Sequence, residues 1–136
     1  MIELQEDIIS LDAVFEHFLD EQQGGYCTFD GRVRSVNKGE EIDHLFFEAH
    51  ASMALKEMQK IADDSKIRFD IEDLAIVHRL GKVLPGQSAV VIVARNHHRG
   101  GIFDAVDYAI NALKESVPIW KKEVLQNGEY WVSAFP

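Results

Sequence analysis

The fold class follows from residues 88–113, which read SAVVIVARNHHRGGIFDAVDYAINAL. The apolar run from Ser88 to Arg95 predicts a buried strand, and the polar segment His97 to Gly101 predicts a loop. From about Gly101 to Ser116, apolar residues recur at helical spacing. We expect the buried face of this helix to consist of Phe103, Val106, Ile110 and Leu113. A buried strand therefore leads through a short loop into an amphipathic helix.

Short elements of both kinds continue on either side of this unit. Ser10 can cap a helix that runs to about Gln23, with Gly24-Gly25 as its stop. A second helix is expected from residue 51 to about 66, with Met53, Leu55, Met58 and Ile61 available for burial.

Strands are expected at residues 26–34, 42–50 and 71–80, with turns at 37–39 and 81–86. Asn127-Gly128 predicts a hairpin between residues 123–126 and 129–133. Strands and helices intermix without regular strand–helix–strand alternation, so the pattern predicts an α+β fold with mixed or antiparallel strands and about three helices.

Length and composition indicate one globular domain over residues 1–136, in which an acidic N-terminal helix (1–24) precedes a core (25–136). The longest apolar runs, such as 89–94, fall far short of the roughly 20 residues of a membrane helix, and the N-terminus lacks the basic start of a signal peptide. The single cysteine, Cys27, excludes an internal disulfide and fits a reducing cytosol, and its strand-like surroundings do not favour a catalytic thiol. We expect a cytoplasmic protein that does not bind membranes.

The net charge of −9 is unevenly distributed. Residues 1–31 hold eight acidic residues and no lysine or arginine, whereas the remaining residues hold 14 basic and 15 acidic ones. Nucleic-acid binding requires a broad basic face, so the sequence disfavours it. The acidic first helix is interpreted as a solvated face, with docking to a partner as the alternative.

Two clusters of cations stand out in this acidic chain. His97, His98 and Arg99 precede two glycines at the start of a predicted helix, where unpaired backbone N–H groups and a positive dipole favour a phosphate or carboxylate. The alternative is an ordinary surface loop. A metal site built on these histidines with His78 or His50 is disfavoured, because neighbouring residues on an extended chain point in opposite directions.

The second cluster is Lys114, Lys121 and Lys122. Pro118 cannot continue the helix, so the chain turns there, and Trp120 is expected to anchor the turn and give the lysines a fixed presentation. Closely spaced cations favour an anionic ligand. Alternatively, Lys114 only stabilises the helix C-terminus, and the other two lysines are solvated.

Arg32 and Arg34 lie two residues apart in a predicted strand. The sequence therefore predicts that they share one face and can grip an anion together, although surface arginines on strands are also common.

Several motifs occur in order along the chain. They are Phe29-Asp-Gly-Arg-Val-Arg-Ser-Val-Asn37, Phe47-Glu-Ala-His50 with Met53-Ala54, His78-Arg-Leu-Gly81 with Pro85-Gly86, His98-Arg99 with Phe103, Leu113-Lys114 with Val117-Pro-Ile-Trp-Lys-Lys-Glu123, and Trp131-Val132. Together they resemble the large, catalytic subunit of molybdopterin synthase, over about residues 24–132.

The resemblance implies an α/β hammerhead fold with additional antiparallel strands. It implies transfer of two sulfurs to cyclic pyranopterin monophosphate, which forms the dithiolene of molybdopterin in molybdenum cofactor biosynthesis. The donor would be the thiocarboxylated Gly-Gly C-terminus of a small ubiquitin-like subunit. The large subunit would be a homodimer within a heterotetramer, and no metal or organic cofactor is expected.

By the same resemblance, Lys114 and Lys121 match the catalytic lysines of the family, and Arg34, His98 and Arg99 match its substrate-binding residues. Phe29, in the motif before Arg34, and Lys122, a third candidate cation, are further substrate-binding candidates. We expect the arginines and His98 to hold the phosphate, and Lys114 with Lys121 to meet the sulfur-bearing tail and stabilise an oxyanion.

The chain departs from the family pattern at two places. Many relatives carry an arginine shortly after the terminal Trp-Val that is thought to reach the neighbouring subunit's pocket, whereas this chain has Phe135, so Arg95 or Lys122 is a candidate substitute. Gly100-Gly101 replaces the more usual serine or alanine at the helix start. A non-catalytic module that binds a ubiquitin-like tail or a phosphorylated ligand is the alternative function. The apolar C-terminal run, residues 130–135, suits either a subunit contact or a core strand.

Overall fold

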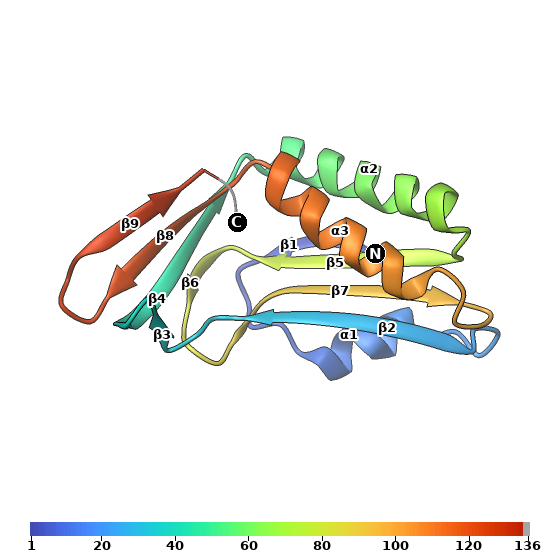
Figure 1. Cartoon of the computed structure of the whole chain (residues 1–136), viewed down its shortest axis with the longest axis horizontal. Helices are drawn as coiled ribbons and strands as arrows, with labels where there is room; N and C mark the ends of the chain where they lie inside the picture. Colours follow the sequence, from blue (N-terminus) through green and yellow to red (C-terminus); the bar gives the residue numbers. More distant parts are fainter. Residues whose placement is uncertain (135–136) are drawn as a thin grey trace.

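The computed structural model describes residues 1–134, in which strands and helices intermix along the chain (Figure 1). The strands are β1 (Ile2–Gln5), β2 (Gly25–Arg32), β3 (Val36–Asn37), β4 (Glu40–Ala49), β5 (Asp73–Arg79), β6 (Gly81–Val83), β7 (Ser88–Asn96), β8 (Ile119–Leu125) and β9 (Tyr130–Ser133). The helices of the described part are α1 (Leu11–Phe18), α2 (Ala51–Phe69) and α3 (Ile102–Ser116). This arrangement confirms the α+β class. None of these three helices has the combination of length and apolar character that crossing a bilayer requires.

The main sheet has the strand order β1-β5-β7-β2, with β1 parallel to β5 and the other pairs antiparallel. Its central strands, β5 and β7, are buried on both faces, which explains their nearly continuous apolar runs. Helices α2 and α3 cover one face around Met58, Ile92 and Leu113, and α1 covers the other through Val14 and Phe18 (Figure 1). Burial of these apolar side chains is the main source of stability.

The second sheet has the order β3-β4-β8-β9 and projects from the main body as an arm (Figure 1). Strand β6, which follows β5 after one residue, pairs with β4 and joins the two sheets. The predicted turn at 37–39 is confirmed, because Lys38 (φ 52°) and Gly39 (φ 79°) both adopt the left-handed conformation that a two-residue hairpin turn requires. The predicted hairpin around Asn127-Gly128 is also confirmed, but its first strand begins already at Ile119.

The predicted N-terminal helix is wrong in extent. Strand β1 precedes it and joins the main sheet, so residues 1–24 do not form one helix. Helix α1 ends at Phe18, because polar groups near Asp20 bond locally instead of continuing the helix. The Asp20 carboxylate accepts from the Gln22 N–H at 2.9 Å, and the Asp20 N–H donates to the Tyr26 hydroxyl at 2.8 Å. Gly24-Gly25 therefore does not stop the helix.

Two helix faces also differ from expectation. Phe103 is 65% exposed, and the buried face of α3 is formed by Ile102, Ala105, Val106, Ala109 and Leu113. In α2, Met58 and Ile61 are buried as expected, whereas Met53 and Leu55 are exposed and smaller residues such as Ala54 and Ala62 face the sheet. Small residues at these positions let both helices approach the sheet closely.

Candidate active site

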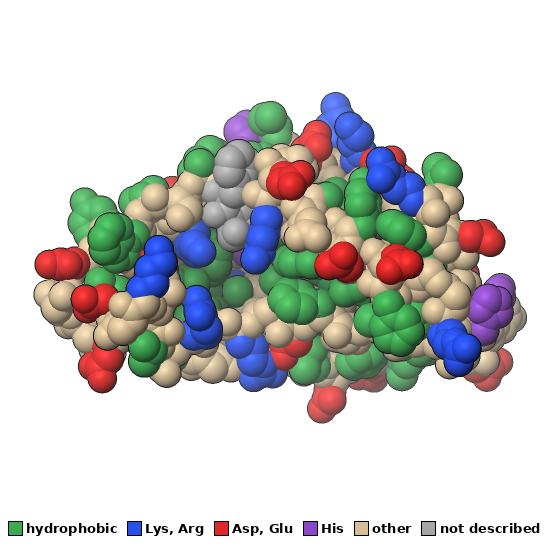
Figure 2. Space-filling model, in the orientation of Figure 1, with side chains coloured by type: hydrophobic (Ala, Val, Ile, Leu, Met, Phe, Trp, Pro, Cys, Tyr) green, Lys and Arg blue, Asp and Glu red, His purple; other side chains and the backbone are tan. Residues whose placement is uncertain are grey.

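Two of the lysines singled out by sequence, Lys114 and Lys121, line one cavity of about 210 Å³ where the arm meets the main body. Figure 2 shows a group of lysine and arginine side chains on the face over this junction. Phe29 lies on the same cavity wall. The complete lining is Phe29, Gly31, Arg32, Val33, Leu45, Phe47, His78, Ala89, Val90, Ile110, Leu113, Lys114 and Lys121.

The elements fix both lysines through their buried neighbours. Lys114 occupies the last turn of α3, directly after Leu113, which is fully buried in the core. Lys121 lies on β8 opposite Phe47 of β4, and opposed residues of paired strands present their side chains on the same face. Because Phe47 is buried and lines the cavity, Lys121 is directed into it as well.

Among residues 1–134, no carboxylate lines this cavity. Arg32, its other cation, is bound elsewhere: its Nε lies 2.6 Å from the Asp30 carboxylate, and its Nη1 donates to the Gly86 carbonyl at 2.8 Å. Within residues 1–134, neither Lys114 nor Lys121 forms an ion pair with an acidic side chain. Two uncompensated ammonium groups at one cavity favour an anionic ligand.

His78 is a cavity residue that the sequence analysis placed in a family motif and in a disfavoured metal site, without a role at the lysine site. It is fully buried and packs edge-on against Phe47, with ring centroids 5.0 Å apart. Burial lowers the pKa of His78 to about 4, although a hydrogen bond of 2.7 Å from its Nδ1 to the Arg79 carbonyl opposes the shift. With this pKa the ring is neutral near pH 7. Its single proton lies on Nδ1, which donates to the carbonyl, so Nε2 remains an acceptor. The sequence feature that could have identified His78 is its position as a histidine within a mostly apolar strand.

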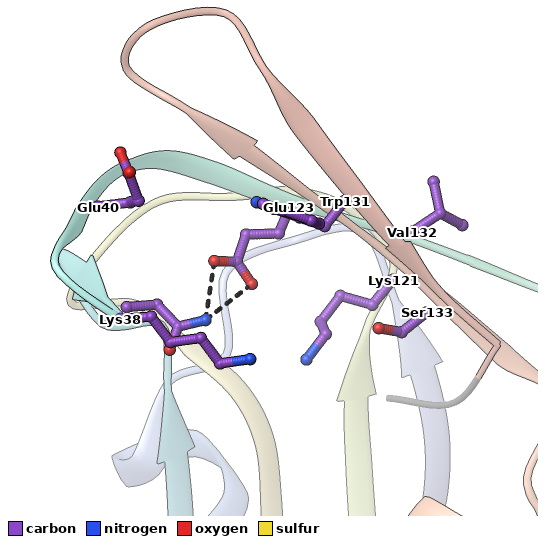
Figure 3. A pocket seen from close by; sticks show the side chains of 8 residues that line it. Lys38, Glu40, Lys121, Glu123, Trp131, Val132 and Ser133 are labelled. Carbon is purple, nitrogen blue, oxygen red and sulfur yellow. Dashed lines mark hydrogen bonds between the residues drawn. The ribbon is translucent and has the colours of Figure 1, made fainter.

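A second cavity, of about 380 Å³, lies on the arm and shares Lys121 with the first. Its lining consists of Asn37, Lys38, Glu40, Lys121, Glu123, Trp131, Val132 and Ser133. Figure 3 shows the ammonium groups of Lys38 and Lys121 pointing toward one another below the Glu123 carboxylate. Sequence reasoning missed Lys38 because its place in the site depends on the turn that connects β3 to β4.

Arg32 and Arg34 do not form the predicted pair. The β2–β7 register shifts between Gly31 and Arg32, and β2 ends there, so the two side chains do not follow strand alternation. Arg32 lines the smaller cavity, whereas Arg34 donates from Nη2 to the Asn37 side chain at 3.0 Å. Arg34 therefore lies beside the larger cavity.

Lys122 and Trp120 occupy the opposite face of β8 from Lys121. The Lys122 ammonium lies 4.3 Å from the centroid of the Tyr130 ring and forms a cation–π contact with it. Lys122 therefore does not join Lys114 at the smaller cavity. Trp120 is 43% exposed and lines a shallow groove with Phe46 and Val132, so the expectation that it anchors the turn is wrong. The buried residues Val117 and Ile119 hold the chain where it changes from helix to strand.

His98 and Arg99 lie at the other end of α3. Both are exposed in the loop between β7 and α3, where His98 Nδ1 accepts from the Gly100 N–H at 3.2 Å. At about 1.5 Å per residue, the helix separates this loop from Lys114 by roughly 20 Å. One chain therefore does not bring its two predicted anion-binding groups together. Phe135, the position that departs from the family's arginine, lies outside the described residues.

A family model described as MoaE protein matches residues 4–116. The chain belongs to the MoaE family. The molybdopterin synthase catalytic subunit of Pyrococcus abyssi is 38% identical over 109 residues, which cover 80% of this chain and 74% of that protein. The protein of the same name from Dictyostelium discoideum is 39% identical over 129 residues, with coverage of 93% and 82%.

Solved structures agree with this membership. The crystal structure of molybdopterin synthase from Staphylococcus aureus matches with a TM-score of 0.89 and 34% identity, covering 96% of this chain and 95% of that one. A complex of subunits 1 and 2 of the molybdopterin-converting factor from Helicobacter pylori matches with a TM-score of 0.77 and 25% identity, covering 93% and 86%. The fold of this MoaE chain is thus the fold of those proteins.

Proposed function

We propose that this chain acts in molybdenum cofactor biosynthesis as the catalytic subunit of molybdopterin synthase. It transfers sulfur from the thiocarboxylated C-terminus of a small ubiquitin-like subunit to cyclic pyranopterin monophosphate. The observation that carries the proposal is the meeting of Lys114 and Lys121 at one cavity, to which residues 1–134 contribute no carboxylate, in a member of the MoaE family. Both proposed reactants are anions, so the same electrostatic feature serves both.

The two cavities suit the two reactants. A Gly-Gly tail has no side chains, so it can enter the smaller cavity of about 210 Å³ between Phe29 and Lys114. The larger cavity, of about 380 Å³, has room for a fused heterocycle and offers Trp131 as an aromatic wall. Lys121 lines both cavities and therefore lies where the sulfur donor and its acceptor would meet.

The lysines supply electrostatic stabilisation and proton transfer. As the thiocarboxylate sulfur bonds to the pterin side chain, negative charge develops on oxygen, and the ammonium groups of Lys114 and Lys121 stabilise it. One of the two lysines donates a proton to the leaving oxygen as a general acid. Water then attacks the carbonyl carbon of the tail and breaks its bond to sulfur, so that the sulfur stays on the pterin and the small subunit leaves with a carboxylate. His78 lines the same cavity and is neutral near pH 7, so it adds no positive charge to that of the lysines.

The proposed assembly is a homodimer of this chain with one small subunit at each end. It gives His98 and Arg99 a role, because the roughly 20 Å along α3 excludes them from the lysine cavity of their own chain. In a dimer, the second copy can present them to the substrate phosphate. Residues 1–136 would form one domain, and the proposed location is the cytoplasm.

Reconstitution tests the proposal. The purified chain is mixed with thiocarboxylated small subunit and cyclic pyranopterin monophosphate, and the pterin product is measured by mass spectrometry. We expect molybdopterin from the parent chain. Lys114→Ala should reduce the yield by about 100-fold or more, because it removes a charge aimed at the transition state. Since Lys114 is exposed and unpaired within the described residues, the melting temperature of the variant should match that of the parent.

Lys56→Ala on the exposed face of α2 is the matched control and should retain full yield. Full activity of Lys114→Ala would remove this residue from the mechanism. A parent chain that binds the small subunit without turnover would instead indicate the non-catalytic binding module.

A further inference from the structure

Two residues close together in the sequence and one distant residue form a hydrogen-bonded chain at the edge of the larger cavity. Arg34 Nη2 donates to Asn37 Oδ1 at 3.0 Å. Asn37 Nδ2 donates in turn to both carboxylate oxygens of Glu123, at 3.0 and 3.3 Å (Figure 3). Asn37 thus links an exposed arginine to a buried carboxylate that is 86 residues away in sequence.

The chemistry of the neighbours fixes the orientation of the Asn37 amide. A carboxylate only accepts hydrogen bonds and a guanidinium only donates them, so the amide nitrogen must face Glu123 and its oxygen must face Arg34. An aspartate at this position would place two carboxylates together, and an apolar residue would bond to neither neighbour. An amide is therefore the side chain that this position requires.

Asn37 also determines what Glu123 does to the cavity. Glu123 follows Lys121 by two residues on β8, so the two side chains share a face, and both line the cavity. Both Glu123 oxygens are engaged by Asn37, and within the described residues Glu123 forms no ion pair with Lys121 or Lys38. Asn37 thereby holds the carboxylate out of an ion pair with either lysine.

We propose that Asn37 is a positioning residue for substrate binding: it holds the Arg34 guanidinium at the cavity edge and keeps the Glu123 carboxylate off Lys121. This inference rests on the proposed function, because its ligand is the phosphorylated pterin. Asn37 does not itself touch the reacting atoms. It acts mainly through Arg34 and to a smaller extent through Lys121, and both of these residues present their charges to the anionic substrate.

The test measures the affinity of the complex with the small subunit for cyclic pyranopterin monophosphate by calorimetry, together with the single-turnover rate at saturating substrate. We expect Asn37→Ala to raise Kd by about tenfold, the effect of losing one charge-assisted hydrogen bond, while the single-turnover rate changes by less than about threefold. Arg34→Ala should weaken binding at least as much. Asn37→Ala added to Arg34→Ala should weaken it by no more than about threefold further, because Asn37 acts mainly through Arg34.

An exchange of partners provides the rescue. Asn37→Asp should weaken binding by about tenfold, because it opposes two carboxylates. Adding Glu123→Gln restores a complete chain, in which the amide introduced on β8 donates to the carboxylate introduced on β3, and that carboxylate accepts from Arg34. Binding by the double variant should therefore return to within about threefold of the parent. Asn111→Ala, on the exposed face of α3, is the matched control and should bind as the parent does.

Each other outcome is decisive. If Asn37→Ala binds the pterin as tightly as the parent, or if its effect multiplies with that of Arg34→Ala, the positioning role is wrong while the proposed function stands. If Glu123→Gln fails to rescue Asn37→Asp although both proteins melt at the parental temperature, the hydrogen-bonded chain does not control binding. A parent complex that neither binds nor converts the pterin overturns the proposed function and this inference with it.

Discussion

Burial of His78 couples the stability of the molecule to pH. Its pKa in the folded chain is about 4, whereas an unfolded chain titrates near 6.5. As the pH falls through 6.5 toward 4, His78 binds a proton in the unfolded state but not in the folded state. The contribution of neutral His78 to the free energy of unfolding is therefore fully present above pH 6.5 and is lost below it. The loss should reach about 2 kcal/mol at pH 5 and about 3 kcal/mol near pH 4.

Urea unfolding at pH 7 and pH 5 measures this coupling when the parent is compared with His78→Gln. The glutamine variant lacks the titrating group, so its free energy of unfolding should depend less on pH over this interval by about 2 kcal/mol. Parallel pH profiles for the two proteins would contradict the assignment of the effect to His78. His17→Gln, a solvent-exposed histidine on α1, is the matched control and should retain the parental profile.

At the same scale, sequence reasoning identified some cavity residues and missed others for a definite reason. Lys114 and Lys121 stood out because cations cluster around Pro118 in an acidic chain, and both line the smaller cavity. Asn37 and Lys38 gave a local signal for a turn but none for a place at a cavity, because their neighbours there come from β8, far along the chain. Their catalytic or binding roles, like those of the lysines, stay predictions until they are tested.

At the level of elements, Gly101 at the start of α3 offers a sharp test of backbone geometry. Its φ of 75° is left-handed, and a Cβ at this position would overlap the Phe69 carbonyl at the end of α2. Gly81 has a similar φ of 81°, but a Cβ there would meet open space. Both glycines permit a conformation that strains other residues, yet only Gly101 also permits a close approach of two elements.

Gly81→Ala should therefore cost about 1 kcal/mol of unfolding free energy, the conformational term alone. Gly101→Ala should cost about 3 kcal/mol or more, because the backbone of α2 must also move. Chemical denaturation of the two variants provides the measurement. Equal losses would show that the packing of α3 against α2 does not depend on this glycine.

Elements with a long periodic pattern were predictable, and short ones were not. Residues 51–69 and 102–116 form helices close to the expected ranges, because their apolar spacing spans several turns. Strands β1, β3 and β6 have at most four residues each and exist only through pairing with β5 or β4. Tertiary pairing of this kind leaves no period in the local sequence. The predicted range of helix α1 was too long, because the local hydrogen bonds of Asp20 compete with the helix.

At the level of the whole molecule, the two anion-binding candidates lie at opposite ends of α3. If each active site takes its lysines from one chain and His98 with Arg99 from another, two inactive variants should complement one another. Lys114→Ala and Arg99→Ala, each inactive alone, are co-refolded in equal amounts. Half of the dimers are then mixed, and each mixed dimer holds one intact site, so about a quarter of the parental activity should return.

A mixture that stays inactive would mean that both groups serve the same site of one chain, whereas an Arg99→Ala variant that is active alone would show that Arg99 has no role. Parent chain co-refolded with Lys114→Ala gives the reference for the efficiency of subunit exchange. Size-exclusion chromatography with light scattering verifies that mixed dimers form.

Side chains alternate along β8, so every second residue faces the cavities. Lys121 and Glu123 face the cavities, whereas Trp120 and Lys122 face away, and this assignment depends only on whether a position is odd or even. A single-residue insertion or deletion between Val117 and Lys121 would exchange the two sets while leaving most strand hydrogen bonds available. We therefore expect this family to tolerate substitutions in the segment far more readily than changes in its length. Length changes that persist in evolution should add or remove an even number of residues, because only these keep the same side chains toward the cavities.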